Sequence, residues 1–202
     1  LYANTLFHDY ALDDLMIIKE NKFTKEGIEG ISKILTSDSF TGFFGEDKNL
    51  LQGGRYRPLS QIMFAIEYEL FGLSPFAGHA INIILYSILC ILIFLLSRKL
   101  FNIEIFKEWY LSAPFIISIL FLAHPIHTEV VANIKGRDEI LSMIGGIAAL
   151  YYSLQYIERK QLKYLLWTFL YFAIGLFAKE SAIAFFAIVP LTLYMLKKSK
   201  LR

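Results

Sequence analysis

The sequence predicts an all-α membrane protein: a polytopic bundle of transmembrane helices with a large extracytoplasmic loop that contains amphipathic interfacial helices. Two observations predict this class. Hydrophobic residues make up 56% of the 202 residues, which is more than the roughly 45–50% of a soluble domain. They also gather in blocks that short charged clusters separate, as expected when lipid is the solvent of the blocks.

Five apolar blocks follow one another after residue 76, and each is expected to form a helix. They are residues 77–97, 109–123, 140–156, 164–178 and 181–196. A membrane span takes about 20 residues, with a range near 17–25, so the first block is long enough and three others are short. Short blocks gain length when their polar ends lie inside the protein. Residues 76–202 are therefore predicted to form a transmembrane bundle of about five helices.

Residues 1–75 contain no block of spanning length and are predicted to form the extracytoplasmic loop. Two stretches have the apolar spacing of amphipathic helices. Thr24 is expected to cap the first, whose apolar residues lie between Ile28 and Leu35. Pro58 suits the first turn of the second, which extends to Leu70. The segment between them, rich in Gly, Ser, Asp and Phe, is expected to be a loop.

Basic residues predict the orientation of the bundle, because cytoplasmic connectors carry an excess of Lys and Arg. Three alternate connectors hold ten of them: Arg98, Lys99 and Lys107, then Arg159, Lys160 and Lys163, then Lys197, Lys198, Lys200 and Arg202. The two other short connectors hold three: Lys135, Arg137 and Lys179. The first set is therefore expected in the cytoplasm and residues 1–75 outside, since long loops translocate largely regardless of charge.

The net charge argues against a nucleic-acid partner, and the cysteine content excludes an intrachain disulfide. A net charge of +2 is too small to favour nucleic acid. The single cysteine, Cys90, lies in an apolar block, so an intrachain disulfide is excluded and a passive role is expected. The chain begins at Leu1 and ends in a basic run, and we interpret it as a piece of a longer protein.

Three polar groups fall on the predicted outer face. One contains the acidic pair Asp13–Asp14, one runs from His124 to Glu139, and one is Lys179–Glu180. Ionisable residues at membrane depth are costly and usually face a cavity or a partner. A carboxylate could act as a general base, while Lys, Arg and His could hold a phosphate. The residue types favour transfer chemistry on a lipid-linked phosphate.

Each group also has a structural interpretation, which the residues leave open. Asp14 could cap the helix that begins at Leu15. Lys179 and Glu180 could neutralise each other, and Arg57 could be an ordinary interface residue. Arg137 with Asp138 could anchor a helix end at the interface.

The histidines also have structural interpretations. His124 and His127 could be hydrogen-bonded residues at a helix end. With Glu129 they do not have the spacing of the helical zinc motif. His79 and Asn82, one turn apart, are expected to form hydrogen bonds between helices.

The sequence resembles the membrane-embedded part of the protein O-mannosyltransferase-like glycosyltransferases of the GT-C class, in particular members with a tetratricopeptide repeat domain after the membrane region. The matching pieces occur in the family's order and span nearly the whole chain. They are Asp13-Asp14, Tyr56-Arg57-Pro58-Leu59, Leu70 to Phe76, His79 with Asn82, His124 to Ala132, Gly136-Arg137-Asp138 and Lys179-Glu180. The family's first membrane helix, the region after the fifth block and the repeat domain have no counterpart in these residues.

The resemblance implies an activity. Members transfer a sugar, commonly mannose, from a polyprenyl-phosphate donor to a hydroxyl of a protein or glycan acceptor, with inversion. Asp13 or Asp14 is the implied general base, and the donor phosphate would be bound by Arg137, Lys179, Arg57 or His127. His124, Glu129, Asp138 and Glu180 would support these residues. Some members of the class use a divalent metal, and the residues leave this cofactor open.

Two other functions fit the composition. A non-catalytic membrane scaffold that anchors a repeat domain would not need the acidic pair. A transporter favours ionisable residues, or helices interrupted by Gly or Pro, near the bilayer midplane, whereas the centres of these blocks are mostly apolar and uninterrupted. Residue usage rich in Ile, Lys and Phe favours a bacterial plasma membrane over the endoplasmic reticulum.

Overall fold

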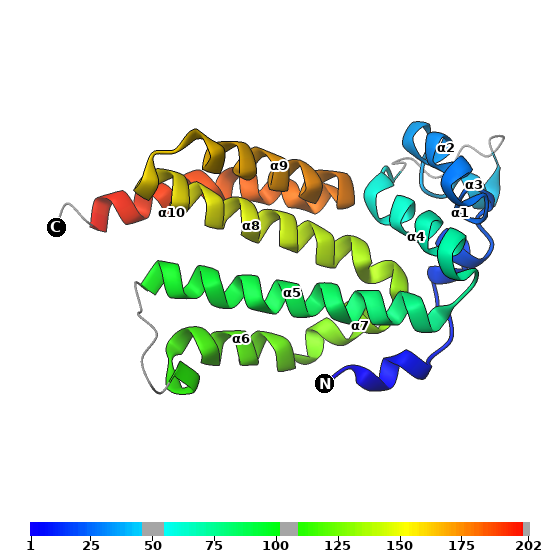
Figure 1. The fold of residues 1–202 in the computed structure, drawn as a ribbon, viewed down its shortest axis with the longest axis horizontal. Coiled ribbons are helices and arrows are strands. Elements are labelled where there is room, and N and C mark those ends of the chain that lie inside the picture. Colours follow the sequence, from blue (N-terminus) through cyan, green and yellow to red (C-terminus); the bar gives the residue numbers. More distant parts are fainter. Residues whose placement is uncertain (46–54, 102–108, 200–202) are drawn as a thin grey trace. The chain divides into compact units, whose positions relative to one another are not determined.

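The computed structural model describes residues 1–45, 55–101 and 109–199, and every regular element in these ranges is a helix. Figure 1 shows the order of the helices along the chain. Lys107, Lys200 and Arg202, which contributed to the predicted orientation, lie outside the described residues.

The first 45 residues form short helices that the sequence predicted only in part. They are 3-10 helices at Ala3–Phe7 and Gly27–Gly30, a π-helical turn at Leu15–Lys19, and helices α1 (Lys22–Lys25), α2 (Ile31–Thr36) and α3 (Thr41–Phe44). Asn21, not Thr24, caps α1, because its side-chain oxygen accepts from the amides of Phe23 and Thr24. Gly27, at φ +61°, interrupts the single helix expected here, since this backbone conformation is not helical.

Helix α4 (Pro58–Phe71) begins at Pro58 as predicted, because the fixed φ of proline suits the first helical position. It packs against α1 and α2 (Figure 1). Phe64 of α4 is buried in a core cluster with Ile17, Ile18 and Ile134. This cluster joins the start of the chain to a segment more than a hundred residues later.

One main helix covers most of each of the five apolar blocks. These are α5 (Pro75–Phe101), α6 (Ala113–Ala123), α8 (Arg137–Arg159), α9 (Leu162–Ala178) and α10 (Phe185–Ser199). Short 3-10 helices at Trp109–Leu111 and Glu180–Ala184 precede α6 and α10. Between α6 and α8 lie a 3-10 turn at Pro125–His127, helix α7 (Thr128–Ala132) and a 3-10 turn at Ile134–Gly136.

Two helical stretches, Pro75–Phe101 and Ile134–Arg159, are long and apolar enough to cross a membrane. Helix α6 and the stretch Pro125–Ala132 meet at a bend of 50° and make a third if they act as one span. Helices α9 and α10 are apolar but shorter. The all-α class with membrane-spanning helices is confirmed, and the number of five spans stays a prediction.

The chain divides into two compact units. The first contains Leu1–Ser87, His124–Leu141 and Phe177–Lys179, and the second contains the remaining described residues. This division differs from the expected boundary between residues 75 and 76, which separates loop from bundle and stays a prediction. The first unit holds all three predicted polar groups except Glu180, so the candidate site can be described within it.

Candidate active site

The two neighbouring carboxylates Asp13 and Asp14 have opposite surroundings. Asp14 is fully buried, and its side chain accepts from the amides of Ala11, Ile134 and Lys135 at 3.1, 3.3 and 2.7 Å. Burial raises the pKa of the Asp14 carboxyl, while these backbone donors act in the opposite direction. Its carboxylate forms no hydrogen bond that caps the following turn, so the capping interpretation was wrong: the chain turns its oxygens towards residues 134–135 instead.

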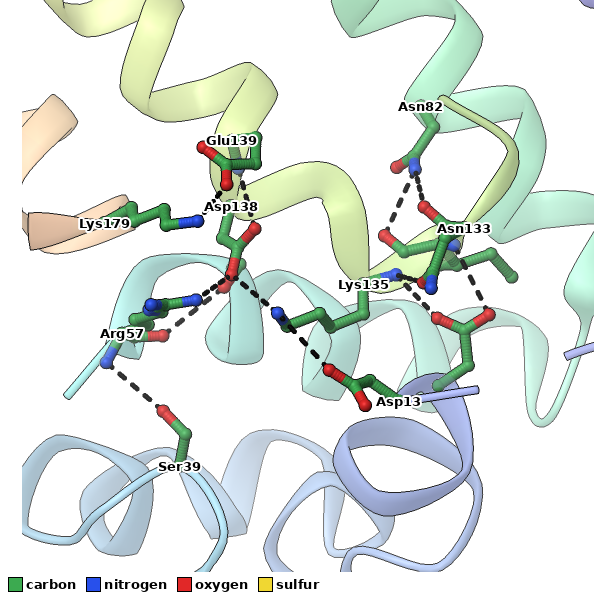
Figure 2. A network of polar contacts seen from close by, with 12 residues as sticks. Asp13, Ser39, Arg57, Asn82, Asn133, Lys135, Asp138, Glu139 and Lys179 are labelled. Carbon is green, nitrogen blue, oxygen red and sulfur yellow. Dashed lines mark hydrogen bonds and ion pairs between the residues drawn. The ribbon is translucent and has the colours of Figure 1, made fainter. Parts of the chain in front are cut away.

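Asp13 is accessible, with 39% of its side chain exposed, and its carboxylate lies 3.6 Å from the Lys135 amine. Figure 2 shows this amine between two carboxylates, since it also lies 3.4 Å from Asp138. Asp138 in turn accepts from the Arg57 guanidinium at 2.8 Å. Four groups of alternating charge therefore form a row that runs from the surface at Asp13 to the buried Arg57.

Arg137 is fully buried, and its guanidinium donates hydrogen bonds to three other residues of the protein. Its Nε donates to Asn82 Oδ1 at 2.9 Å, and one terminal nitrogen donates to the Gly78 carbonyl at 3.2 Å. Both terminal nitrogens donate to the Glu67 carboxylate. The guanidinium also lies over the Phe64 ring, 4.5 Å from its centre. An interfacial anchor would be exposed, so that interpretation of Arg137 was wrong.

Glu67 is a residue that the sequence analysis missed. Its side chain is 14% exposed, and burial raises the pKa of its carboxyl while Arg137 lowers it. Apolar spacing in this helix favoured a face that includes Ile66 and Leu70, whereas the structure buries Phe64 and Ala65 and leaves those two residues exposed, so the spacing did not mark Glu67 as buried. A carboxylate on an apolar face needs a partner of opposite charge.

Lys179, expected to bind phosphate or to neutralise Glu180, forms an ion pair with Glu139 at the start of α8 (Figure 2). Glu180 belongs to the other compact unit, and Glu129 is exposed on α7. Glu67, Asp138 and Glu139 pair with the cations Arg137, Arg57 and Lys179, and of these three carboxylates the resemblance implied Asp138 alone.

The four histidines all lie in the first unit. His124 Nδ1 accepts from the Ile126 amide at 3.2 Å and caps the short turn Pro125–His127. The His127 ring packs on Tyr86 and His124, and His79 is buried beside the His8 ring. No three potential ligands among His, Cys, Asp and Glu come together to hold a metal in the described part of the chain.

Asn82 forms the interhelical hydrogen bonds that the sequence predicted. Its amide nitrogen donates to the carbonyls of Asn133 and Ile134 at 3.0 and 3.1 Å (Figure 2), in addition to the contact with Arg137. The segment that carries Lys135 is therefore held from one side by Asn82 and from the other by Asp14. These contacts give residues 133–138 a fixed place beside the acidic pair.

Residues 57–202 match the family described as dolichyl-phosphate-mannose-protein mannosyltransferases. The chain is similar to a protein O-mannosyl-transferase of Caenorhabditis elegans, with 33% identity over 150 residues that cover 74% of this chain and 20% of the relative. It is also similar to the Homo sapiens protein O-mannosyl-transferases TMTC3, with 34% identity over 148 residues, and TMTC1, with 32% over 143. These matches cover 73% and 71% of this chain and 15% of each relative. No solved structure matches the chain.

Proposed function

Because the chain belongs to the dolichyl-phosphate-mannose-protein mannosyltransferase family, we propose that it forms part of an integral membrane enzyme that transfers mannose from a polyprenyl-phosphate donor to a hydroxyl group of a protein or glycan acceptor. The chain spans about a fifth or less of the relatives it matches. The identity of the donor, the identity of the acceptor and the presence of a downstream repeat domain are therefore proposed for the full-length protein.

The observation that carries the proposal is the accessible carboxylate of Asp13 beside the Lys135 amine. A general base must reach the proton that it removes. Asp13 meets this condition with 39% of its side chain exposed, whereas Asp14 is fully buried and engaged by three backbone amides. Asp13 is therefore the proposed base, and Asp14 is the residue that fixes the chain at this point.

Lys135 is the proposed cation for the donor phosphate. The Arg57 side chain is only 8% exposed and pairs with Asp138, and Arg137 is fully buried, so neither guanidinium faces solvent. The Lys135 side chain is 17% exposed, and its amine lies between Asp13 and Asp138. An ammonium on a flexible stem can turn towards a phosphate without breaking a buried bidentate pair.

In the proposed reaction the acceptor hydroxyl gives its proton to the Asp13 carboxylate as its oxygen attacks C1 of the mannose. The bond between C1 and the phosphate oxygen breaks, and its electron pair leaves with the phosphate. Attack from the side opposite the phosphate inverts the configuration at C1. The Lys135 ammonium offsets the charge on the leaving phosphate, a contribution that is larger in a site shielded from water.

The test is sugar transfer from polyprenyl-phosphate mannose in membranes that contain the full-length protein. Asp13→Asn should lower the rate by about 10²–10⁴-fold, the usual contribution of a general base. The matched control is Asp9→Asn, a nearby exposed carboxylate that accepts from the Tyr10 amide, and it should transfer at the wild-type rate. Each variant is checked for normal membrane insertion.

The outcomes separate the alternatives. Transfer by Asp13→Asn at the wild-type rate would show that the base has been misassigned. A correctly inserted wild-type protein that transfers no sugar would favour the scaffold. The relatives named above are animal proteins, so they give no support to a bacterial plasma membrane, and the extracytoplasmic side of the site stays part of the proposal.

A further inference from the structure

Glu67 and Arg137 form a buried pair that joins three helices of the first unit. Glu67 lies on α4, Arg137 begins α8, and the Asn82 and Gly78 partners of Arg137 lie on α5. The bidentate contact between a guanidinium and a carboxylate is the strongest and most directional form of ion pair. The three elements therefore meet at one guanidinium.

We propose that Glu67 is a positioning residue for the site: its carboxylate, rather than a donor phosphate, is the anion that Arg137 binds, and the pair fixes the start of α8. This inference rests on the proposed transferase function, since the residues that it positions are those of the proposed site. It changes the role that the resemblance gave to Arg137, from donor binding to support.

The position of Arg137 in the chain explains how it can fix the positions of the neighbouring site residues. Lys135 precedes it by two residues and Asp138 follows it directly, and these two residues carry the middle of the charged row. Asn82 holds both the Arg137 Nε and the carbonyls of residues 133 and 134. Movement of Arg137 would therefore move the Lys135 amine relative to Asp13.

The burial of the pair argues against direct donor binding. A phosphate would have to displace the Glu67 carboxylate from Arg137, because Glu67 already takes both terminal nitrogens. The displaced carboxylate would remain 14% exposed without its cation. Breaking a buried pair by removing one partner is far more costly than replacing both partners together.

A rescue experiment in the full-length protein tests the assignment. Arg137→Met should lower both the transfer rate and the melting temperature in detergent, because it leaves Glu67 buried and unpaired. Adding Glu67→Gln should restore activity on the order of tenfold relative to Arg137→Met, within the range of coupling between contacting residues. The donor KM of the double variant should return close to the wild-type value.

The control is Glu67→Gln combined with Arg57→Met, the other buried arginine of the unit with a carboxylate partner. Glu67→Gln should restore nothing in this background, since Arg57 pairs with Asp138. If Arg137 binds donor phosphate, the double variant with Arg137→Met will keep a raised donor KM and a low rate, and the inference is overturned.

The melting temperatures separate this inference from the proposed function. If the wild-type protein transfers no mannose but Glu67→Gln still restores the melting temperature of Arg137→Met, the transferase proposal is contradicted and the Glu67–Arg137 pair is supported. If the wild-type protein transfers mannose but Glu67→Gln restores neither the rate nor the melting temperature of Arg137→Met, the role of the pair is contradicted and the transferase proposal is supported.

Discussion

Asp13 and Asp14 are adjacent, yet one is accessible and the other is enclosed. The difference comes from their surroundings, because three backbone N–H groups converge on Asp14, whereas the Asp13 carboxylate faces the Lys135 amine. Sequence alone gives the pair and its chemistry. It cannot choose between them, since two of the three donors belong to residues 134 and 135.

Asp14→Asn is expected to lower the free energy of unfolding by about 1–3 kcal/mol, the cost of leaving a buried donor unpaired. An asparagine side chain has one acceptor oxygen and one donor nitrogen, so at least one of the amides that now donate to Asp14 would face a donor. The melting temperature in detergent measures the loss. Asp13→Asn, at an accessible ion pair, should change stability by less than about 1 kcal/mol, and an equal loss in both variants would contradict the assignment.

Tyr10 predicts a dependence of stability on alkaline pH. Burial, with the nearby charges of Asp14, Glu67 and Asp9, raises the pKa of Tyr10 from 10.0 to about 12. The folded state therefore prefers the neutral phenol, so this contribution to stability is complete below pH 10 and is lost as the pH rises to about 12. Melting temperatures of the wild type and Tyr10→Phe across this range should diverge, with the steeper fall in the wild type; parallel curves would refute the prediction.

At the scale of the helices, Gly145 of α8 sets how closely α9 can approach within the second unit. A Cβ atom at Gly145 would lie 2.5 Å from the backbone nitrogen of Gly175 and 2.6 Å from the Tyr171 carbonyl oxygen. Backbone atoms cannot move aside as a flexible side chain can, so the two helices would have to separate. Close helix contact through small residues is a common packing mode in membranes.

Gly145→Ala is expected to destabilise the protein by about 1–3 kcal/mol, as overpacking commonly does. Gly175→Ala is the matched comparison from the other side of the same contact, where the nearest atoms would lie 3.2 Å away, and it should cost less. Melting temperatures in detergent compare the two variants. A larger loss at Gly175 would contradict this account of the helix contact.

Local signals predicted the helices well where they were strong. Pro58 marked the start of α4, and each apolar block contained a helix. The prediction failed where two local signals competed, since Thr24 and Asn21 both suit a helix cap and Asn21 is the one that makes the contacts. Thr24 instead donates to the Ile17 carbonyl from a buried position.

At the scale of the whole molecule, the predicted orientation can be measured. In a cysteine-free background of the full-length protein, a membrane-impermeant maleimide should label Gln161→Cys from the cytoplasmic side of sealed membranes and label Lys25→Cys from that side only after permeabilisation. Both positions are exposed, so the contrast would come from the membrane rather than from burial. The reverse pattern would invert the topology and place the candidate site on the cytoplasmic side.

The candidate site was predictable as a set of residue types but not as a set of contacts. The resemblance pointed to Arg57, Arg137 and Asp138, which the structure places in paired, buried positions. The pairing of Glu67 could not be predicted from the sequence, because its partner lies 70 residues away and helical periodicity carries no information over that distance. The pairing of distant charges depends on how α4, α5 and α8 meet.

The long separation between the partners of Asp14 also has a consequence for biosynthesis. Asp14 and Lys135 are 121 residues apart, and a ribosome adds about 5–20 residues per second. Roughly ten seconds therefore pass between the emergence of the acidic pair and that of the amides that enclose Asp14. During this interval the short helices around it can pack against α4, but two of the three amides that enclose Asp14 have not yet been made, so this region should depend on chaperones at the membrane until residues 134 and 135 have been added.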